Sequence, residues 1–312
     1  MGIDPGGLIS VRGLSRAGVD VLLGSARAMR DDGLRPELTG TQVNLFFEAS
    51  TRTRNSFEIA GQRLGLSVVN MEVASSSLSK GESLEDTVRT IDAMAPDFLV
   101  VRHSRAGAPD EVARWTRGAV INAGDGAREH PTQALLDCLT LCDRFGARSI
   151  EGLSGLTIAL VGDVAHSRVA RSNLALWSMA GAKVRLVGPR AFVPEGFEEL
   201  GWDVHRDLES GIAGVDVVYA LRIQAERQHG TVYPSLGEYY TRYGLTIERM
   251  DRWAPGAVVM HPGPVNRGVD LAADLVREPR SLVEKQVENG VWIRMAVLHR
   301  LHEARKEARG DG

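Results

Sequence analysis

The sequence predicts an α/β protein of two doubly wound domains, each built on a parallel sheet, with long helices joining the domains. From residue 40 onward, short runs rich in Val, Ile and Phe alternate with longer stretches of helical period. This β-α order is typical of right-handed crossovers and a parallel sheet. The alternation stops at one long helical stretch and restarts after Gly155. The 312 residues also suffice for about two domains of roughly 150 residues each.

In the first half, each apolar run is expected to be a strand and each stretch between two runs a helix. The strands are expected at residues 43–48, 67–73, 97–102 and 119–123, and the helices near residues 53–64, 83–94 and 109–117. A long helix is then expected at 131–145, stopping at Gly146, as the joint between the halves. Its buried face is expected to contain Ala134, Leu135, Cys138, Leu141, Cys142 and Phe145.

The second half repeats the pattern. Strands are expected at residues 156–162, 183–188, 215–221 and 257–260. One helix is expected at 168–180, ending at Gly181, and a last helix at 291–308. Apolar residues recur at helical spacing along the last helix before its charged, solvated end.

Composition places the chain among ordinary folded proteins. Apolar residues make up 43% and charged residues 25%, which excludes disordered and low-complexity classes. The 37 basic and 40 acidic residues give 37 − 40 = −3, so no overall field recruits nucleic acid or an anionic membrane. No apolar run approaches the ~18 residues of a membrane span, and the N-terminus lacks secretory and myristoylation signals. We therefore expect a soluble, cytoplasmic protein.

Two cysteines, Cys138 and Cys142, lie four residues apart on one side of the expected joint helix. Neighbouring polar residues do not complete a familiar zinc spacing. Both cysteines are therefore interpreted as small buried apolar residues, and no metal site is expected.

The densest chemistry follows the first strand, where residues 50–54 read Ser-Thr-Arg-Thr-Arg at the start of a helix. A helix start offers backbone N–H groups and the positive end of the helix dipole. The side chains add hydroxyl donors from Ser50, Thr51 and Thr53 and guanidinium donors from Arg52 and Arg54. This pattern predicts a phosphate-binding turn, although an N-capped helix with solvated arginines is the alternative. Neither a Walker loop nor a GxGxxG fingerprint occurs, so a small phosphorylated molecule is favoured over ATP or NAD.

The second motif, His130-Pro131-Thr132-Gln133, opens the joint helix. Proline suits the first helical position, and the positive helix end disfavours a charged imidazole. A neutral His130 could donate to a carbonyl oxygen that becomes more negative during a reaction. The alternative is a His and Gln pair that only caps the helix.

The third motif, His261-Pro262-Gly263-Pro264, ends the last strand, and its prolines fix a backbone path whose carbonyls can accept an N–H donor. A merely structural turn is the alternative. Three arginines lie just beyond strand ends, where ligands of open α/β sheets bind, although each could be a surface residue. They are Arg102, Arg168 and Arg222, the last followed by Gln224.

Lys80 stands in a loop of small polar residues that has little to pack. A solvated flexible loop is one interpretation. A mobile loop that brings one cation to an anionic substrate is the other.

Together the three motifs resemble those of the aspartate/ornithine carbamoyltransferase family, and the resemblance runs from about residue 40 to the final helix. It implies carbamoyl transfer from carbamoyl phosphate to the α-amine of L-aspartate, a step of de novo pyrimidine biosynthesis, without a cofactor. It implies a carbamoyl-phosphate domain at residues 1–134, on which helix 288–312 packs, and an aspartate domain at residues 135–287. It also implies a homotrimer whose sites lie between domains and are shared between subunits. Whether dihydroorotase or regulatory chains join the trimer stays open.

The resemblance also assigns roles to residues. Ser50, Thr51, Arg52 and Thr53 would hold the phosphate, together with Ser77, chosen from Ser75, Ser76 and Ser77. Arg102, His130 and Thr53 would polarise the carbonyl, while Gln133 and the backbone carbonyls of Gly263 and Pro264 would take the carbamoyl amine. Lys80, Arg168, Arg222 and Gln224 would bind aspartate. Lys80 would come from the neighbouring chain and, with Arg52, Thr53, Arg102 and His130, would form the catalytic set.

The sequence departs from the family pattern in two places. The loop has one lysine before Gly81 where some relatives have two, and Gly263 replaces a bulkier residue. A role played by a backbone carbonyl survives the second change.

Three other interpretations compete. An ornithine carbamoyltransferase would share the phosphate-binding turn, but such relatives carry a cysteine-bearing turn at 261–264 and an acidic element for a cationic substrate. A non-catalytic scaffold subunit would be expected to have lost motif residues, and none is lost here. A dinucleotide-binding oxidoreductase would need the absent glycine fingerprint.

Overall fold

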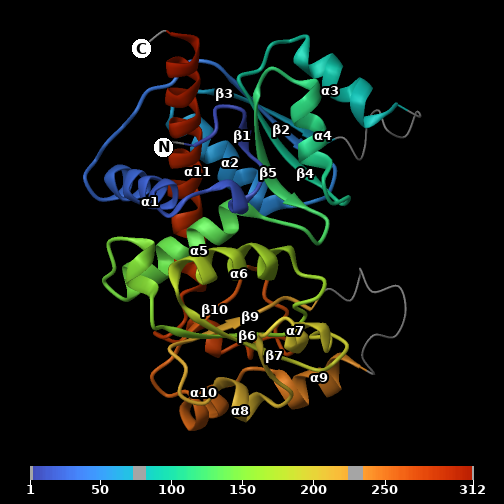
Figure 1. Cartoon of the computed structure of the whole chain (residues 1–312), viewed down its shortest axis with the longest axis vertical. Helices are drawn as coiled ribbons and strands as arrows, with labels where there is room; N and C mark the ends of the chain where they lie inside the picture. The colour runs from blue at the N-terminus through green and yellow to red at the C-terminus, as the bar shows by residue number, and fades with distance from the viewer. Residues whose placement is uncertain (1–2, 73–81, 224–234, 311–312) are drawn as a thin grey trace. The chain divides into compact units, whose positions relative to one another are not determined.

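The structure, a computed structural model, describes residues 3–72, 82–223 and 235–310. The chain divides into two compact units. Unit 1 comprises Met1–Leu139, Arg148–Ile150 and Glu288–Gly312, and unit 2 comprises Thr140–Ala147 and Glu151–Val287. Each unit contains a five-stranded parallel sheet with helices between its strands, which confirms the predicted fold class (Figure 1).

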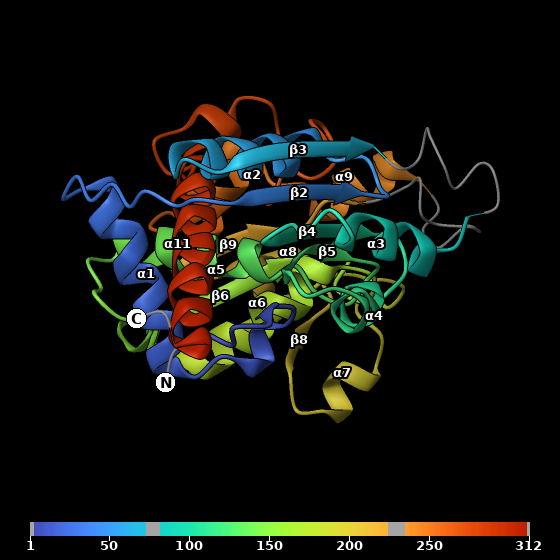
Figure 2. The ribbon, with the colours of Figure 1, turned by 90° about the horizontal axis from the view of Figure 1, so that it is seen from above.

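The first sheet has the order β1-β5-β4-β2-β3, with all neighbours parallel. Its strands are β1 (Gly7–Leu8), β2 (Thr41–Phe46), β3 (Ser67–Glu72), β4 (Phe98–His103) and β5 (Ala119–Asp125). The connecting helices are α2 (Thr51–Arg63), α3 (Leu84–Asp92) and α4 (Ala108–Trp115). From β2 the chain goes to β3, its neighbour in Figure 2, and later to β4 on the other side of β2. The boundary between β2 and β4 is therefore the switch point, where open α/β sheets bind ligands.

Alternating side chains on β2 explain the layers around this sheet. Val43 and Leu45 share a core cluster with apolar residues of α3 and α4. Gln42 points to the other face, where its Nε2 donates to the carbonyl of Phe57 in α2 at 3.1 Å. Successive strand residues face opposite sides, so helices cover both faces.

Packing of α2 fixes the start of this helix at the carboxyl end of β2. Phe57, Ala60 and Leu64 are fully buried, and their spacing places them on one face of the helix. Gly61 allows the close approach, because a Cβ there would lie 2.8 Å from Val68 Cγ2.

The remaining helices of the first half are one that was not predicted and the joint helix, which was. The helix α1 (Arg16–Arg30) follows a 3₁₀ turn η1 (Val11–Gly13), and neither was predicted. The joint helix α5 (Pro131–Arg144) begins at the predicted proline, and Cys138 and Cys142 in it are free and buried. Phe145 does not belong to its buried face: the side chain is 37% exposed, because the helix ends before it and Gly146 turns the chain with φ 69°.

The second sheet has the order β10-β9-β6-β7-β8, again all parallel. Its strands are β6 (Thr157–Val161), β7 (Lys183–Val187), β8 (Asp203–His205), β9 (Val217–Ala220) and β10 (Val258–Met260). This part also contains the helices α6 (Arg168–Ala180), α7 (Gly196–Glu199), α8 (Leu208–Ile212), α9 (Leu236–Tyr243) and α10 (Ile247–Trp253). Its 3₁₀ turns include η4 (Ile150–Leu153) and η6 (Leu275–Arg277). The switch point here lies between β6 and β9.

Two separate cores hold the second sheet. On one face, Trp177 of α6 meets Tyr219 of β9 edge-on at 5.5 Å between ring centroids. On the other, apolar residues of α8, α9 and α10 cluster on the sheet. The last helix, α11 (Val283–Arg309), starts eight residues before the predicted 291. None of the helices in the described part of the chain combines the length and apolar character needed to cross a membrane.

Candidate active site

The first sheet presents the predicted phosphate-binding turn at its switch point. Strand β2 ends at Phe46 and α2 begins at Thr51, so residues 50–54 form the first turn of a helix at the carboxyl edge of the sheet. Ser50 is the N-cap residue, with φ −161° and ψ 87°, and its side chain makes no capping hydrogen bond. Its hydroxyl is therefore not committed to the helix, while the first backbone N–H groups of any helix lack partners within it.

The side chains of this turn divide by burial. Thr51 and Arg52 are exposed, whereas Thr53 is buried with 8% exposure. Exposed donors beside a buried hydroxyl suit a small anion that contacts the helix end from one side.

Arg102 lies at the same edge. It is part of β4, which extends to His103, and so it does not lie beyond the strand end as predicted. Its Nη1 donates to the carbonyl of Ala123 in β5 at 3.1 Å, and its Nε lies 3.5 Å from Glu48 Oε2. The backbone N–H of Phe47 donates to the carbonyl of Arg102 at 2.9 Å. Both the neighbouring strand and the loop after β2 thus hold this guanidinium at the switch point.

His103, which is not among the residues predicted from the sequence, lies next to this arginine. Its ring centroid is 5.0 Å from that of Phe47, and its Nδ1 accepts the backbone N–H of Arg105 at 2.8 Å. Burial, reinforced by the positive charge of Arg105, lowers the pKa of His103 below its usual value. The side chain is therefore held neutral more readily than a solvated histidine.

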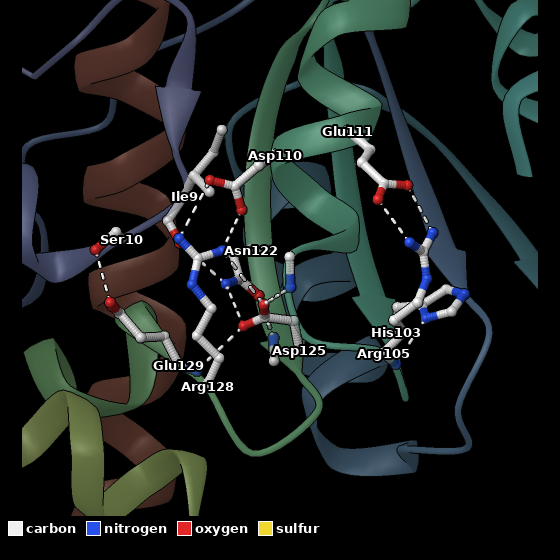
Figure 3. A network of polar contacts seen from close by, with 12 residues as sticks. Ile9, Ser10, His103, Arg105, Asp110, Glu111, Asn122, Asp125, Arg128 and Glu129 are labelled. Atoms are coloured by element: carbon white, nitrogen blue, oxygen red, sulfur yellow. Dashed lines mark hydrogen bonds and ion pairs between the residues drawn. The ribbon is translucent and has the colours of Figure 1, made fainter.

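A buried carboxylate fixes the loop that leads from β5 to the second motif. Asp125 has no exposed surface, and its oxygens accept from the backbone N–H of Gly107 at 2.7 Å, from Asn122 Nδ2 at 2.9 Å and from the backbone N–H of Glu129 at 3.1 Å (Figure 3). An ion pair between Arg128 and Asp110 lies beside it.

Glu129 ties this loop to the N-terminal segment. Its carboxylate accepts from Ser10 Oγ at 2.7 Å (Figure 3). It also accepts from the backbone N–H of Val11 at 2.8 Å. Glu129, the residue before His130, is thus held through its backbone N–H by Asp125 and through its side chain by Ser10 and Val11, which restrains the position of His130.

The second motif starts α5 as predicted. His130 is buried with 5% exposure, and its carbonyl accepts the backbone N–H of Gln133 at 3.0 Å. The side-chain Nε2 of Gln133 donates to Asp137 Oδ1 at 3.0 Å. Because the amide nitrogen is engaged by Asp137, the amide oxygen is the part of Gln133 suited to accept an N–H donor.

The second sheet carries its arginines at its own switch point. Arg168 is the first residue of α6 and is buried with 5% exposure, while Ser167 caps the helix by accepting the backbone N–H of Ala170 at 3.1 Å. Arg222 is partly buried and lies two residues beyond the end of β9. Gly162, with φ 123°, lets the loop after β6 pass close to β9, because a Cβ there would lie 3.2 Å from Leu221 Cβ. Two cations thus lie at one edge of this sheet.

The third motif follows β10 at the same edge. The backbone N–H of Gly263 donates to His261 Nδ1 at 2.8 Å, and His261 Nε2 lies 3.1 Å from Asp270 Oδ2. Gly263 has φ 66°, and the bond from it to Pro264 is cis. The imidazole of His261 thus connects the backbone of Gly263 to Asp270, which restrains the conformation of the turn and the direction of its carbonyls.

The structure thus gathers the predicted residues at two sheet edges, one in each unit. The first edge carries Ser50, Thr51, Arg52, Thr53, Arg102, His130 and Gln133, and the second carries Arg168, Arg222, Gly263 and Pro264. The predictions for Ser77, Lys80 and Gln224 concern residues outside those the structure describes. Across the described ranges, no group of three or more His, Cys, Asp or Glu side chains is arranged to hold a metal ion.

Two family models match the chain. The carbamoyl-phosphate-binding domain of aspartate/ornithine carbamoyltransferases matches residues 7–143, and the aspartate/ornithine-binding domain of the same family matches residues 154–301.

Curated relatives match over nearly the whole chain. The aspartate carbamoyltransferase catalytic subunit of Methylorubrum extorquens strain PA1 is 51% identical over 300 residues, covering 94% of both chains. That of Chelativorans sp. strain BNC1 is 49% identical over 311 residues, covering 98% of this chain and 95% of the relative.

Solved structures agree. Aspartate transcarbamoylase from Trypanosoma cruzi in complex with carbamoyl phosphate and aspartate is 35% identical, with a TM-score of 0.82 and coverage of 94% of this chain and 96% of that chain. The same enzyme in complex with N-(phosphonacetyl)-L-aspartic acid is 36% identical, with a TM-score of 0.80 and 94% coverage of both chains.

Proposed function

Because the chain belongs to the aspartate/ornithine carbamoyltransferase family, we propose that it catalyses transfer of the carbamoyl group of carbamoyl phosphate to the α-amine of L-aspartate. The products are N-carbamoyl-L-aspartate and phosphate. The observation that carries the proposal is the chemical difference between the two sheet edges. Hydroxyl groups, a helix start, Arg52, Arg102 and the buried His130 lie at the first edge, while Arg168, Arg222 and the turn with the Gly263 and Pro264 carbonyls lie at the second.

Carbamoyl phosphate fits the first edge. Ser50, Arg52 and Thr53 would hold the phosphate with the N–H groups of the α2 first turn, and Thr51 would add donors. Arg102 and His130, with the Thr53 hydroxyl, would polarise the carbonyl oxygen. The amide oxygen of Gln133 would accept an N–H of the carbamoyl group, because its nitrogen already donates to Asp137.

Aspartate fits the second edge. Arg168 and Arg222 would bind its two carboxylates, together with Lys80 and Gln224, and the carbonyls of Gly263 and Pro264 would accept from the carbamoyl N–H groups. Ser77 is proposed as a further phosphate contact. Lys80 and Ser77 would come from a neighbouring subunit of a homotrimer.

The chemistry needs little covalent help from the protein. The neutral α-amine nitrogen attacks the carbonyl carbon, a tetrahedral oxyanion forms, and the bond from carbon to the phosphate oxygen breaks. The amine proton leaves with the phosphate or to solvent. Arg102 and His130 face the developing negative charge, so the protein acts by positioning and by electrostatic stabilisation.

The choice of aspartate over ornithine follows from charge. Two arginines at the second edge suit a dicarboxylate, whereas the side-chain ammonium of ornithine would meet like charge. The curated relatives compared above are named aspartate carbamoyltransferase catalytic subunits, which favours the same choice.

The direct test supplies carbamoyl phosphate with either L-aspartate or L-ornithine to the purified chain. We expect carbamoyl-aspartate from the first and no citrulline from the second. Citrulline production at a comparable rate would reject the aspartate assignment while leaving the phosphate-binding turn in place.

We further propose a cytoplasmic homotrimer with shared sites, acting in pyrimidine biosynthesis. Mixing an inactive Lys80→Ala chain with an inactive Arg52→Ala chain should restore activity, because some sites in mixed trimers would have both groups intact. Mixed trimers that form and stay inactive would place Lys80 in the site of its own subunit.

A further inference from the structure

A buried carboxylate outside the three motifs joins the two aspartate-side elements of unit 2. The side chain of Asp270 has no exposed surface. Its Oδ1 accepts the backbone N–H of Ile223 at 3.1 Å, and its Oδ2 accepts the backbone N–H of Asn266 at 3.0 Å. Its Oδ2 also lies 3.1 Å from His261 Nε2. Three donors from two separate segments therefore converge on one side chain.

The hydrogen-bond pattern fixes the form of His261. Because the backbone N–H of Gly263 donates to Nδ1 at 2.8 Å, that nitrogen must be an acceptor. In the neutral ring the hydrogen is then on Nε2, which donates to Asp270. The backbone N–H of His261 itself donates to Gln286 Oε1 at 3.0 Å. The turn that carries the Gly263 and Pro264 carbonyls is thus connected to Asp270 by hydrogen bonds through the imidazole of His261.

The carboxylate of Asp270 also holds the backbone of the segment after β9. Ile223 is buried and directly follows Arg222. Its N–H donates to Asp270, and its carbonyl accepts from Asn266 Nδ2 at 2.9 Å. Both backbone polar groups of this residue are therefore held by the segment that follows β10, which leaves the backbone of Arg222 little freedom to move relative to the turn.

We propose that Asp270 is a positioning residue: it sets the spacing between Arg222 and the carbonyls of Gly263 and Pro264. This inference rests on the proposed function. In that function Arg222 holds aspartate and the carbonyls hold the carbamoyl amine, so their spacing aligns the attacking nitrogen with the carbonyl carbon. Small errors in such an alignment are costly to rate.

The test replaces Asp270 by asparagine, which keeps the shape but turns one acceptor oxygen into an NH₂ group facing an N–H donor. We expect the KM for aspartate to rise and kcat to fall, each by about tenfold or more, with carbamoyl phosphate affinity measured by calorimetry changed less than about threefold. This split between the two substrates is what a purely structural role would not produce.

Asp216→Asn is the matched control. Asp216 Oδ2 accepts the backbone N–H of Thr157 at 2.8 Å, at the amino end of the same sheet and away from the arginines. We expect this variant to lose stability while keeping both KM values. If Asp270→Asn behaves as Asp216→Asn does, the positioning role is wrong.

A second variant covers the case in which Asp270→Asn fails to fold. Asn266→Ala removes only the side-chain contact to the Ile223 carbonyl, and it should raise the KM for aspartate in the same direction by a smaller factor. An unchanged KM for aspartate in a folded Asn266→Ala protein would also reject the inference. A wild-type chain that forms no carbamoyl-aspartate would instead reject the proposed function.

Discussion

At the scale of single residues, the side chains proposed to bind substrate at the first edge differ in their exposure and in their contacts within the protein. Arg102 and Gln133 are each oriented by a carboxylate of the protein. Glu48 lies beside Arg102, and Asp137 accepts a hydrogen bond from Gln133. Arg52 is exposed at a helix start. Its loss should therefore affect ligand binding more than folding.

Arg52→Ala tests this expectation. We expect thermal stability close to wild type, a fall in kcat of about 100-fold to 1,000-fold, and weaker carbamoyl phosphate binding, because a charge-stabilising donor is removed. His130→Ala should lose turnover to a similar extent. Steady-state kinetics with calorimetric binding measures both. The control is Arg89→Ala, since Arg89 is exposed and pairs only locally with Glu85 in α3. Unchanged activity in Arg52→Ala would remove the phosphate-binding turn from the mechanism.

Arg222→Ala should act on the other substrate. We expect the KM for aspartate to rise at least about tenfold, and carbamoyl phosphate affinity to change much less, because a charge-assisted contact to one carboxylate is lost. Arg242→Ala is the control, because Arg242 is exposed and pairs with Glu238 within α9. Equal losses for both substrates would show that Arg222 does not discriminate between them.

At the scale of elements, Arg294 of α11 is a buried arginine that contacts α2. Arg294 Nη1 donates to Ser56 Oγ of α2 at 2.8 Å, and its guanidinium lies 5.0 Å from the ring centroid of Phe57. Burial lowers the pKa of Arg294 to about 10, while the charge of Asp137 in α5 acts in the opposite direction. The side chain therefore remains charged near neutral pH.

Arg294→Ala should destabilise unit 1 by about 3 kcal/mol, because it leaves Asp137 buried without that charge. Urea unfolding measures the change. The double variant Arg294→Met with Asp137→Leu should recover part of the loss, since removing both charges avoids an uncompensated one. Arg309→Ala, at the exposed end of α11, serves as the control. A double variant less stable than Arg294→Ala would contradict the electrostatic explanation.

Elements with strong local signals could be predicted from the sequence. Helix α6 matches its predicted bounds from 168 to 180, because Ser167 caps its start and Gly181, with φ 80°, stops it. The first turns of α11 were missed because residues 283–290 are rich in polar side chains. The helices α7 to α10 span four to eight residues each, too few to establish a helical period.

At the scale of the whole molecule, the sequence identified the residues of the motifs but not the residues that position them. Asp125 accepts from Gly107, 18 residues away, and Asp270 accepts from Ile223, 47 residues away. Ser10 and Glu129, for example, are 119 residues apart. A single sequence carries no signal for such pairs, whereas a serine beside a helix start or a proline at its first position is a local pattern.

Stability as a function of pH is a second property of the whole chain. Burial is the main cause that lowers the pKa of His103, His299 and His302 below 6.5, with nearby cations adding to it. Each histidine binds its proton less readily in the folded state, so the unfolded state takes up protons first as the pH falls. The free energy of unfolding should therefore decrease from about pH 7.5 to about pH 5.5.

Urea unfolding across this range measures the effect. His103→Gln should make the decrease smaller, because it removes one of the three groups that titrate differently in the two states. An unfolding free energy that rises toward acidic pH would contradict the assignment.

The uncommitted hydroxyl of Ser50 has a consequence for how the substrate and the fold depend on each other. A helix whose cap residue makes no side-chain bond lacks one acceptor for the N–H groups of its first turn. A phosphate bound there would accept from the N–H groups of the first turn and so act as the N-cap of α2 for as long as it stays bound. Substrate binding would then stiffen α2, in line with the stabilisation that any ligand gives the state it binds. Departure of the phosphate would return these N–H groups to water, while the turn itself stays closed by the Arg54 N–H, which donates to the Ser50 carbonyl at 3.1 Å. Each turnover would therefore add and remove the cap of α2 without unwinding the helix.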